Sequence, residues 1–466
     1  MSQFAAISIW LLLFYVVAHT VSYLVLNVLA IRAVRHQLKG RSSLLDPLGI
    51  SGFEPPISII VPAYNEATTI VSTVRSAMQL AYPEFEIIVV NDGSKDATLD
   101  ALVNAFNMRE FPEAYRVRLA SAKLRAIWHT PQHRNLRVVD KDNGGKADAI
   151  NAGINAARYP LVCVVDADTI LMRDSLLRIA QPFIDDPTTV ACGGTVRIAN
   201  GCRVEEGLLV EVGTPRYWLP LFQVMEYLRA FLFGRMGWSE VNGLLIISGA
   251  FSVMRKDIVI EAGGYLVDTI GEDMEMVLRL HRHMKASGKP YRITFVPDPI
   301  VWTEAPESIA ILKNQRVRWQ RGLCESLWKN RGLLTMKNGG VAGRIAFPFF
   351  LVFELASPVI EILGYLLTAW FVLTGQIDMV VALWLAVTCI AFAMLLAAVT
   401  LLLEEISYHT YPRSADMLLL LGVAFLENFG YRQANAIWRL WGMAKWITGR
   451  PATWGAMHRS GAWQKK

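Results

Sequence analysis

A long stretch without a charged side chain, near the start of the chain, limits what this sequence can fold into. Residues 4–31 contain no Lys, Arg, Asp or Glu. A helix rises about 1.5 Å per residue, so roughly 20 apolar residues are enough to cross a bilayer. This stretch is longer than that. A secretory signal peptide would be shorter and would begin with basic residues, which residues 1–8 lack. The pattern predicts a membrane anchor over residues 1–41.

Basic residues follow this stretch directly, at Arg32, Arg35, Lys39 and Arg41. Because positively charged loops tend to stay in the cytoplasm, the positive-inside rule places the amino terminus outside and the next segment inside. The net charge of +6 suits a protein at the inner leaflet or one that handles phosphorylated substrates, and it does not distinguish the two.

The composition shows that only the middle of the chain resembles a soluble protein. Charged residues make up 18% of the chain, against about 25% in a typical soluble protein, and the deficit lies at the two ends. These values exclude an all-soluble enzyme and a disordered scaffold. Five scattered cysteines without a Cys-x-x-Cys pair argue against a disulfide framework and against a structural zinc site.

Between residues 42 and 307, short apolar runs alternate with helical patterns. We predict strands over residues 57–61, 86–90 and 161–165, with helices such as 68–79 and 146–157 between them. This alternation predicts a parallel sheet covered by helices on both faces. Ligands of such sheets bind beyond the carboxyl ends of the strands, so the polar residues that follow each strand are the candidates for chemistry.

These polar residues form an ordered set. They are Pro62, Tyr64 and Glu66 after the first strand, Asp92 after the second, Lys146 behind Gly144 and Gly145 at a helix start, and Asp166 and Asp168 after the third strand. Any one of them alone is typical of a turn or a solvated strand end, but the whole set favours a binding site. Two carboxylates two positions apart can hold a hard cation against a diphosphate. A glycine pair followed by Lys can approach and neutralise phosphate oxygens.

Two later motifs complete a pattern that resembles a known family. They are Gly271-Glu272-Asp273 and Gln315-Arg316-Val317-Arg318-Trp319. With the strand-end residues, they resemble the nucleotide-sugar-binding core of family 2 glycosyltransferases. They also resemble the four-part motif of processive membrane synthases, those that make cellulose, chitin, hyaluronan and poly-N-acetylglucosamine. The resemblance covers roughly residues 55–325 and implies an α/β domain of the GT-A fold joined to an α-helical transmembrane bundle.

The resemblance also implies a role for each motif. Asp92 would contact the uridine, Asp166 would lie near the nucleotide, and Asp168, together with Asp166, would hold a Mg²⁺ or Mn²⁺ ion. Asp273 would be the catalytic base, with Glu272 as the next candidate. The remaining residues would bind the substrate, with the last three lining the diphosphate and acceptor site: Pro62, Tyr64, Glu66, Lys146, Gln315, Arg318 and Trp319.

The chemistry of inverting sugar transfer agrees with these roles. A carboxylate must take the proton from the attacking hydroxyl, and cations must stabilise the departing diphosphate. Arg suits bidentate phosphate contact, and an aromatic face suits the C–H groups of a sugar ring. Packing on an interfacial helix is the alternative for Trp319. Asp273 could also serve as a helix-start carboxylate, and the two roles are compatible.

Two segments have the pattern of helices that lie along a membrane. Residues 217–233 and 308–333 place apolar side chains between polar or basic ones at helical spacing. A basic amphipathic helix like the second is typical of a helix in the headgroup plane. We therefore expect residues 308–344 to form interface helices beneath a transmembrane exit. Ordinary surface helices of the soluble domain are the alternative.

The chain becomes apolar again over residues 345–447. Residues 345–374 and 379–403 are each long enough to span a membrane, and the first contains Glu354 and Glu361 on about the same helix face. Intramembrane carboxylates normally face a bundle interior or a water-filled path. A polysaccharide conduit and hydrogen bonds to neighbouring helices explain them about equally well. Residues 416–447 either turn back or lie on the surface, because one crossing would put the basic tail outside.

Residues 448–466 are expected to form a cytoplasmic tail. Its Trp454-Gly455 pair with Arg459 resembles the Trp-Gly-Thr gating loop of hyaluronan and chitin synthases, with Ala456 in place of Thr. A second departure from the compact family core is the basic, aromatic stretch at residues 105–137. It fits a solvated helical insertion or a docking surface for a partner. We expect no nucleic-acid partner, because no binding motif accompanies the charge.

These observations predict an inverting, processive hexosyltransferase of the plasma (bacterial inner) membrane, multi-pass and with a cytoplasmic catalytic domain. It would polymerise a UDP-sugar, with UDP-N-acetylglucosamine favoured, into a β-linked polysaccharide and couple synthesis to translocation. Its partners would be the UDP-sugar, the growing polysaccharide and membrane lipid, with an accessory membrane subunit left open. A non-processive transferase that moves one sugar to a lipid phosphate is the alternative. A transporter or receptor subunit with an inactive domain is disfavoured, because Asp168 and Asp273 are both present.

Overall fold

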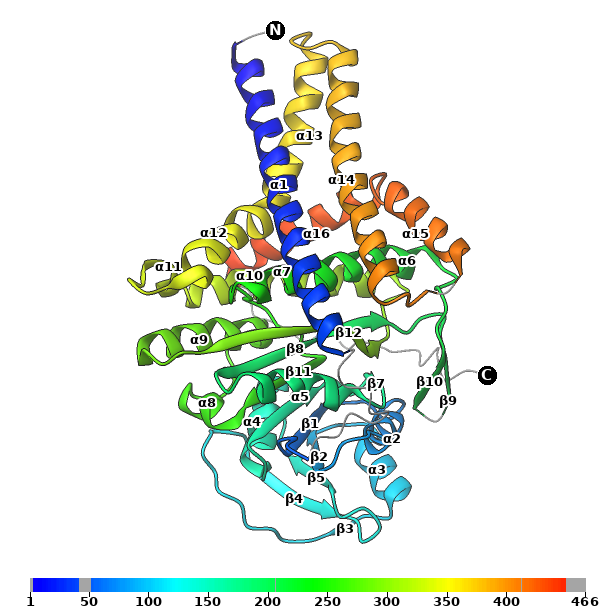
Figure 1. The fold of residues 1–466 in the computed structure, drawn as a ribbon, viewed down its shortest axis with the longest axis vertical. Coiled ribbons are helices and arrows are strands. Elements are labelled where there is room, and N and C mark those ends of the chain that lie inside the picture. Colours follow the sequence, from blue (N-terminus) through cyan, green and yellow to red (C-terminus); the bar gives the residue numbers. More distant parts are fainter. Residues whose placement is uncertain (1–2, 42–51, 206, 412, 450–466) are drawn as a thin grey trace.

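The protein has three tiers: long helices at one end, a layer of helices lying across the molecule, and an α/β domain at the other end (Figure 1). The computed structural model describes residues 3–41, 52–205, 207–411 and 413–449. The tail residues Trp454, Gly455 and Arg459 lie outside the described residues, so their proposed gating role stays a prediction.

The α/β domain is built on one ten-stranded sheet with the order β3-β4-β5-β2-β1-β6-β11-β8-β12-β7. Its strands are β1 (Ile57–Ala63), β2 (Phe85–Asp92), β3 (Arg109–Glu110), β4 (Leu124–His129), β5 (Leu136–Lys141), β6 (Leu161–Val165), β7 (Ile170–Leu171), β8 (Thr189–Ile198), β11 (Phe251–Arg255) and β12 (Arg292–Thr303). A separate hairpin is formed by β9 (Arg203–Glu205) and β10 (Leu208–Glu211).

The predicted parallel arrangement is confirmed for the block β5-β2-β1-β6, which contains all three predicted strands. A purely parallel sheet is wrong, because β11 runs antiparallel to both β6 and β8. Since β8 is in turn parallel to β12, the carboxyl ends of β1, β2, β6, β8 and β12 lie along one edge of the sheet. The predicted strand-end residues lie at or just after the ends of three of these strands, β1, β2 and β6.

Helices pack against this sheet between the strands. They are α2 (Ile70–Met78), α3 (Thr98–Phe106), α4 (Lys146–Ala156), α5 (Ser175–Asp185), α8 (Lys256–Glu261) and α9 (Glu272–Ser287). The apolar side chains of β1 and β2, such as Ile59 and Val89, are fully buried. α4 approaches this core closely at Gly153, where an added Cβ would lie 2.4 Å from a methyl group of Ile60. Only glycine fits there, and this close packing positions the helix that begins with Lys146.

The predicted helical insertion at residues 105–137 is wrong, because this stretch extends the sheet. β4 pairs antiparallel with β5, and β3 pairs with β4. Ile127 and Trp128 favour a strand over a helix. The chain between β3 and β4 has no regular secondary structure, and Asn155 of α4 holds it by accepting hydrogen bonds of 2.9 Å from the amides of Arg118 and Leu119.

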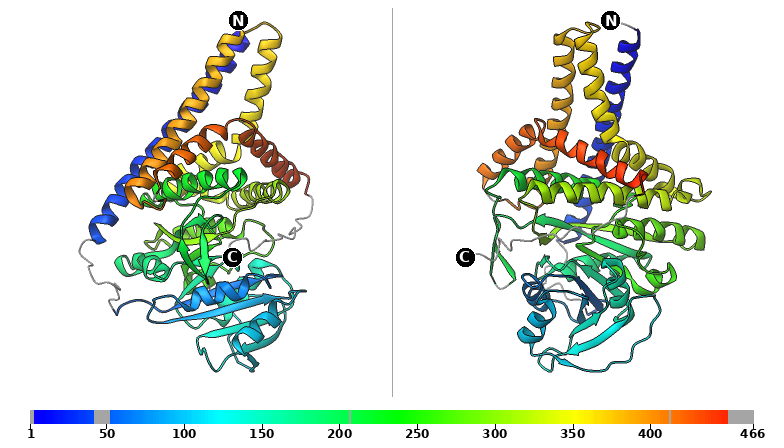
Figure 2. Two further views of the ribbon diagram at one scale, coloured as in Figure 1. Left: turned by 90° about the vertical axis from the view of Figure 1, so that its right-hand side faces the viewer. Right: turned by 180° about the vertical axis from the view of Figure 1, so that it is seen from behind.

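The middle layer contains both predicted amphipathic segments (Figure 2). Its elements are α6 (Trp218–Tyr227), the π-helical η1 (Leu228–Arg235), α7 (Met236–Glu240), α10 (Ile309–Lys329), α11 (Gly332–Thr335), π-helical η2 (Ala342–Ala346), α12 (Phe347–Phe349), π-helical η3 (Phe350–Leu355), α15 (Ser414–Leu426) and α16 (Tyr431–Ile447). α16 packs along α10. Residues 416–447 therefore turn back into the layer rather than continuing upward (Figure 1).

The helices α1, α13 and α14 extend above this layer (Figures 1 and 2). Among the described residues, α1 (Gln3–Arg41) and α14 (Met379–Ser407) are each long and apolar enough to cross a membrane. The third is α13 (Ser357–Leu373), which meets the stretch Ala342–Leu355 at a bend of 42°. The apolar stretch predicted over residues 345–374 is therefore broken.

The bend has an identifiable chemical cause. Pro358 has no amide hydrogen, so the carbonyl of Glu354, its usual helical acceptor, is left without that donor. The guanidinium of Arg439, on α16, donates to this carbonyl instead. Gln320 of α10 donates to the neighbouring carbonyl of Leu355 at 3.4 Å. Side chains of the middle layer thus satisfy the carbonyls that the bend exposes.

Candidate active site

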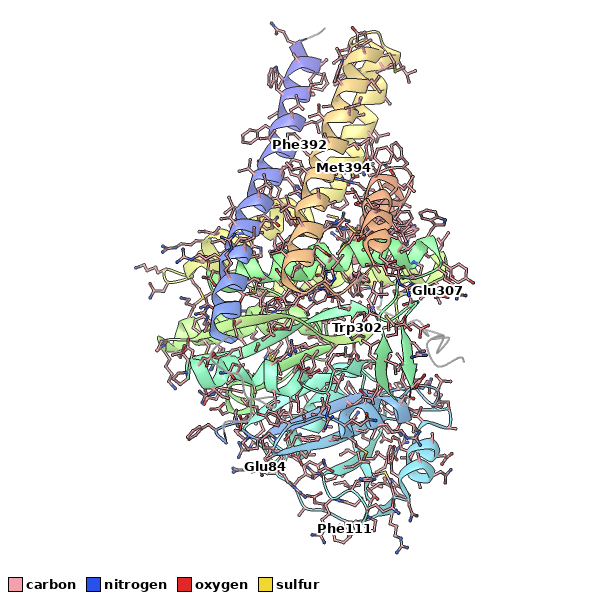
Figure 3. All side chains as sticks on the ribbon, turned by 45° about the vertical axis from the view of Figure 1, so that its right-hand side comes forward. Glu84, Phe111, Trp302, Glu307, Phe392 and Met394 are labelled. Carbon is pink, nitrogen blue, oxygen red and sulfur yellow. The ribbon has the colours of Figure 1, made fainter. Side chains whose placement is uncertain are left out.

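One cavity of about 1700 Å³ contains every predicted site residue. Pro62, Tyr64 and Glu66 line it from the end of β1, Asp92 from β2, and Lys146 from the start of α4. The other contributors follow β6 or lie on α9 and α10: Asp166, Asp168, Glu272, Asp273, Gln315, Arg318 and Trp319. The cavity continues beyond the α/β domain. Glu307 and Phe392, both labelled in Figure 3, line it. Phe392 belongs to α14 and lies above Glu307 in this view.

Asp92 lies at the base of the cavity and is only 3% exposed. Its carboxylate accepts hydrogen bonds from the amides of Gly144 and Gly145, at 2.9 and 2.8 Å, and pairs with the ammonium of Lys141. The glycine pair therefore holds a carboxylate of the protein itself. Because two backbone donors and a buried cation fix Asp92, its orientation is set before any ligand arrives. Its predicted contact with a uridine stays a prediction.

Lys146 lies between carboxylates from two different elements. Its Nζ is 2.6 Å from Asp166 and 3.5 Å from Glu272. Burial by itself would lower the pKa of the Lys146 ammonium, but Asp166 and Glu272 raise it above its ordinary value, so the side chain stays charged. Burial raises the pKa of Glu272 to about 7, against the opposing effect of Lys146.

Asp168 is 3% exposed and accepts a hydrogen bond of 3.0 Å from the hydroxyl of Thr303, at the end of β12. Within the described residues, no group of three or more His, Cys, Asp or Glu side chains could enclose a metal ion. Asp166 and Asp168 nevertheless supply hard carboxylate oxygens in one cavity. Mg²⁺ usually takes only one or two carboxylates and completes its shell with water and phosphate oxygens. This donor set therefore fits a cation shared with a phosphorylated ligand.

Asp273 lies in the first turn of α9 and also lines the cavity, so the two interpretations of this residue are compatible. One carboxylate oxygen accepts from the amide of Met274 at 2.8 Å, and the other from the amide of Gly249 at 3.2 Å. Space beside it is limited, since an added Cβ at Gly249 would lie 2.9 Å from the Lys146 ammonium. These contacts hold Asp273 at the cavity wall.

The motif on α10 divides into two parts. Arg316 is buried, pairs with Glu226 of α6 and lies over the Trp319 ring at 4.5 Å. Trp319 is 43% exposed and lines the cavity. Gln315 is 9% exposed, and its amide oxygen has no hydrogen-bond partner among the described residues. Arg316 therefore covers one face of the Trp319 ring. The exposed part of this indole and the amide oxygen of Gln315 remain at the cavity wall.

Two cations of the site were not identifiable from the sequence. Lys141, which holds Asp92, ends a strand that periodicity alone does not distinguish. Arg235 lines the cavity from the π-helical η1 and lies 3.7 Å from the centre of the Phe231 ring. Burial lowers the pKa of Arg235 to about 10, opposed by the nearby carboxylate of Asp273. The only sequence signal for Arg235 is a basic residue at the end of a largely apolar run that also contains Arg229, and this signal has no specific meaning without the fold.

Comparison with known proteins agrees with this geometry. Residues 55–322 match the model of a family described as glycosyltransferase like family 2. The poly-beta-1,6-N-acetyl-D-glucosamine synthase of Staphylococcus epidermidis is 29% identical over 275 residues, which are 59% of this chain and 56% of that protein. The synthase of the same name from Staphylococcus aureus strain COL is 30% identical over 277 residues, with the same shares. The match thus spans little more than half the length of these relatives.

A solved structure has the same fold. The mannosyltransferase PcManGT from Pyrobaculum calidifontis, in complex with GDP-Man and Mn²⁺, aligns over 94% of this chain and 100% of its own. The TM-score is 0.51 and the sequence identity 18%, so this likeness concerns the fold alone. Because the family match covers more than half of the chain, and because the α/β domain has the GT-A architecture, the protein belongs to glycosyltransferase family 2.

Proposed function

We propose that this glycosyltransferase is a membrane-embedded polysaccharide synthase, which adds sugars from a UDP-sugar to a growing β-linked chain. The observation that carries the proposal is the continuity of the cavity. The same cavity is lined by Asp168 and Asp273 in the α/β domain and by His19, Phe353 and Phe392 on or below the rising helices. A chain extended at Asp273 would have a path toward the membrane without leaving the protein.

The donor that we favour is UDP-N-acetylglucosamine. The support is the name of the relatives from two Staphylococcus species, which are synthases of a β-1,6-linked N-acetylglucosamine polymer. Those relatives also support placing the enzyme in a bacterial plasma membrane with the α/β domain in the cytoplasm, where nucleotide sugars are made. Membrane lipid would surround α1, α13 and α14. The proposal does not depend on an accessory membrane subunit.

The proposed mechanism is an inverting displacement at the anomeric carbon of the donor. Asp273 would accept the proton of the acceptor hydroxyl as that oxygen attacks, since its carboxylate is held at the cavity wall. Asp166 and Asp168 would hold a Mg²⁺ or Mn²⁺ ion, which supplies positive charge to the departing diphosphate. Arg318, Lys146 and Trp319 line the same space. Arg318 would contact the diphosphate, and Trp319 would carry the acceptor ring.

A test of this function uses the full chain in lipid nanodiscs with a panel of radiolabelled UDP-sugars and Mg²⁺ or Mn²⁺. The expected result is a high-molecular-weight product from UDP-N-acetylglucosamine and little incorporation from UDP-glucuronate. A single labelled sugar on an extractable lipid phosphate, without polymer, would instead support the non-processive alternative. UDP release without any glycan product from every donor would contradict both.

A further inference from the structure

Above the α/β domain, the cavity wall carries four arginine–glutamate ion pairs. They are Arg229–Glu427 at 2.5 Å, Arg432–Glu361 at 2.9 Å, Arg439–Glu354 at 3.9 Å, and Arg316–Glu226. All eight residues line the same cavity. We call them the paired-charge wall. Each cation has a carboxylate beside it, so the wall contains eight ionised groups and has no net charge.

Helix α16 organises much of this wall. Arg432, Asn435 and Arg439 recur at intervals of three and four residues, so they project from one side of the helix. Arg432 reaches Glu361 on α13, Arg439 reaches Glu354 on η3, and Asn435 donates to Glu226 on α6 at 3.0 Å. One helix thus connects the membrane-type helices to the middle layer through groups that face the cavity.

The cavity wall beside these pairs also carries neutral groups with unused hydrogen-bonding capacity. The amide oxygens of Gln315 and Asn435 are both buried and have no partner among the described residues. Gln315 is 9% exposed. Buried amide oxygens almost always have a partner in folded proteins. Their position in the cavity indicates that a ligand with neutral donors completes them.

Aromatic rings supply the other surface that a sugar requires. Tyr23 on α1 and Phe353 on η3 line the cavity, and Tyr23 also donates to the carboxylate of Glu354 at 2.5 Å. Tyr23 therefore contacts one of the ion pairs directly. Pyranose rings pack their C–H groups on such faces while their hydroxyl groups hydrogen-bond to polar neighbours.

We propose that the paired-charge wall is a binding site for a segment of uncharged polysaccharide, selective against polymers of either charge. Hydroxyl and acetamido groups can bond to paired Arg and Glu side chains without leaving any ion uncompensated. A polymer carboxylate or ammonium would bring an unpaired charge among groups whose charges already compensate one another, and it would lose part of its hydration there. This inference rests on the proposed synthase function and adds a charge selectivity to the part of the cavity that lies above the α/β domain.

The test measures binding rather than turnover, so it can fail independently of the proposed function. Three oligosaccharides of equal length are titrated into the full chain in nanodiscs: neutral N-acetylglucosamine oligomers, cationic glucosamine oligomers and anionic hyaluronan oligomers. UDP is present to occupy the donor site. We expect the neutral ligand to bind about tenfold more tightly than either charged ligand. Equal binding of all three would overturn the proposal, even if polymer synthesis is observed.

Variants of the pair Arg432–Glu361 test whether the charge of the wall sets the preference among the three oligosaccharides. They distinguish this effect from recognition of the sugar itself and from a loss of folding. Glu361→Gln leaves Arg432 without its carboxylate and should shift the preference toward the anionic oligosaccharide. Arg432→Gln should shift it toward the cationic one. The double variant removes both charges and should restore the preference for the neutral ligand. The exposed surface pair at Arg255 and Asp257 provides the control, because Arg255→Gln should leave all three affinities unchanged.

The variants also distinguish a binding site from a structural one. If both single variants and the double variant lose affinity for all three ligands equally, the pair only supports the fold and the proposal is wrong. If the selectivity shifts occur in a protein that makes no polymer from any donor, the binding site stands and only the synthase function fails.

Discussion

Substitution of Asp273 tests whether its carboxylate is the proposed catalytic base. Its carboxylate faces the cavity but is held by two backbone amides, those of Gly249 and Met274. Asp273→Asn keeps the size of the side chain and removes the proposed proton acceptor. We expect polymer synthesis to fall by at least about a hundredfold, while the affinity for UDP, measured by calorimetry, changes little.

Trp319→Ala is the matched comparison for this prediction. The base remains, but the acceptor loses its aromatic face, so elongation should fail while hydrolysis of the donor to free sugar and UDP persists. Near-normal polymerisation by Asp273→Asn would instead point to Glu272 as the base. Loss of UDP binding in both variants would remove both assigned roles.

Asp168 provides a test of the metal that does not depend on turnover. Replacing it by Asn removes one anionic ligand of a hard cation and retains an acceptor for the Thr303 hydroxyl, which bonds to it at 3.0 Å. We expect UDP binding to Asp168→Asn to lose its dependence on Mg²⁺ or Mn²⁺. Unchanged metal dependence of UDP affinity would exclude Asp168 as a ligand. Asp174→Asn, on the surface of the same domain, is the control, because Asp174 pairs with Arg178 outside the cavity.

For individual residues, the sequence predicted which side chains line the cavity better than it predicted their contacts. Asp92, Asp166 and Asp168 were predictable because strand ends are marked by a change from apolar to polar residues. The cations that hold them were not, since Lys141 reaches Asp92 from a neighbouring strand. That pairing depends on sheet order, which no local pattern encodes. The glycine pair was predicted to approach phosphate, whereas its amides hold Asp92.

Helix α9 carries both the catalytic candidates and a buried histidine that makes its stability depend on pH. The ring of His281 bonds to the Tyr291 hydroxyl at 2.7 Å and to the Leu244 carbonyl at 2.8 Å. Burial lowers the pKa of His281 to about 4. Between about pH 4 and the ordinary value near 6.5, the unfolded chain binds this proton and the folded chain does not. Stability should therefore fall as the pH falls through this window.

The difference between a pKa of about 4 in the folded chain and the ordinary value near 6.5 corresponds to roughly 3 kcal/mol of stability. In His281→Gln, the slope of melting temperature against pH between 4 and 6.5 should be smaller, whatever the stability of the variant at pH 7. Exposed His133→Gln is the control and should keep the wild-type slope. An unchanged slope in His281→Gln would show that other groups govern acid stability.

The contact between α10 and α16 provides a second prediction at the scale of elements. At Gly442, an added Cβ would lie 2.6 Å from the carbonyl oxygen of Val317 and 3.0 Å from Cβ of Gln320. Gly442→Ala should push α16 away from α10 and cost about 1–3 kcal/mol, measured by thermal unfolding in detergent. Gly422→Ala on α15 has open space around its Cβ and should be neutral or slightly stabilising. Equal stability of the two variants would contradict this close packing.

Helices and strands with strong periodicity were predictable, and those shaped by distant contacts were not. β1, β2 and β6 were predicted because each is a buried apolar run, whereas β5, β8, β11 and β12 were not predicted. β3 and β4 were missed, because many of their side chains are charged or exposed and pairing with β5 defines them. The bend before α13 depends on Arg439 and Gln320, which cap its carbonyls from α16 and α10. A hydropathy pattern contains no information about these partners.

At the scale of the whole molecule, the layer of helices connects the α/β domain to the helices that are long and apolar enough to cross a membrane. Buried ion pairs cross between tiers, as in Arg197 of β8 with Glu404 at the end of α14. Breaking such a pair leaves a buried charge without compensation. The α/β domain is therefore attached to the rising helices by specific contacts as well as by the chain. This attachment supports a fixed relation between the proposed site of sugar addition and the proposed path of the product.

The same arrangement predicts which ends of the molecule lie on opposite sides of a membrane. The turn between α13 and α14 lies at the far end of the rising helices, and Glu84 lies at the opposite end, in the α/β domain (Figures 1 and 3). A cysteine at the exposed Thr374, beside this turn, should react with a membrane-impermeant maleimide in intact cells. A cysteine at Glu84 should react only after permeabilisation.

The unmodified chain, whose described cysteines are buried or half-buried, gives the background. Labelling of the Glu84→Cys protein in intact cells would place the α/β domain outside, where cytoplasmic nucleotide sugars could not reach it, and would contradict the proposed orientation.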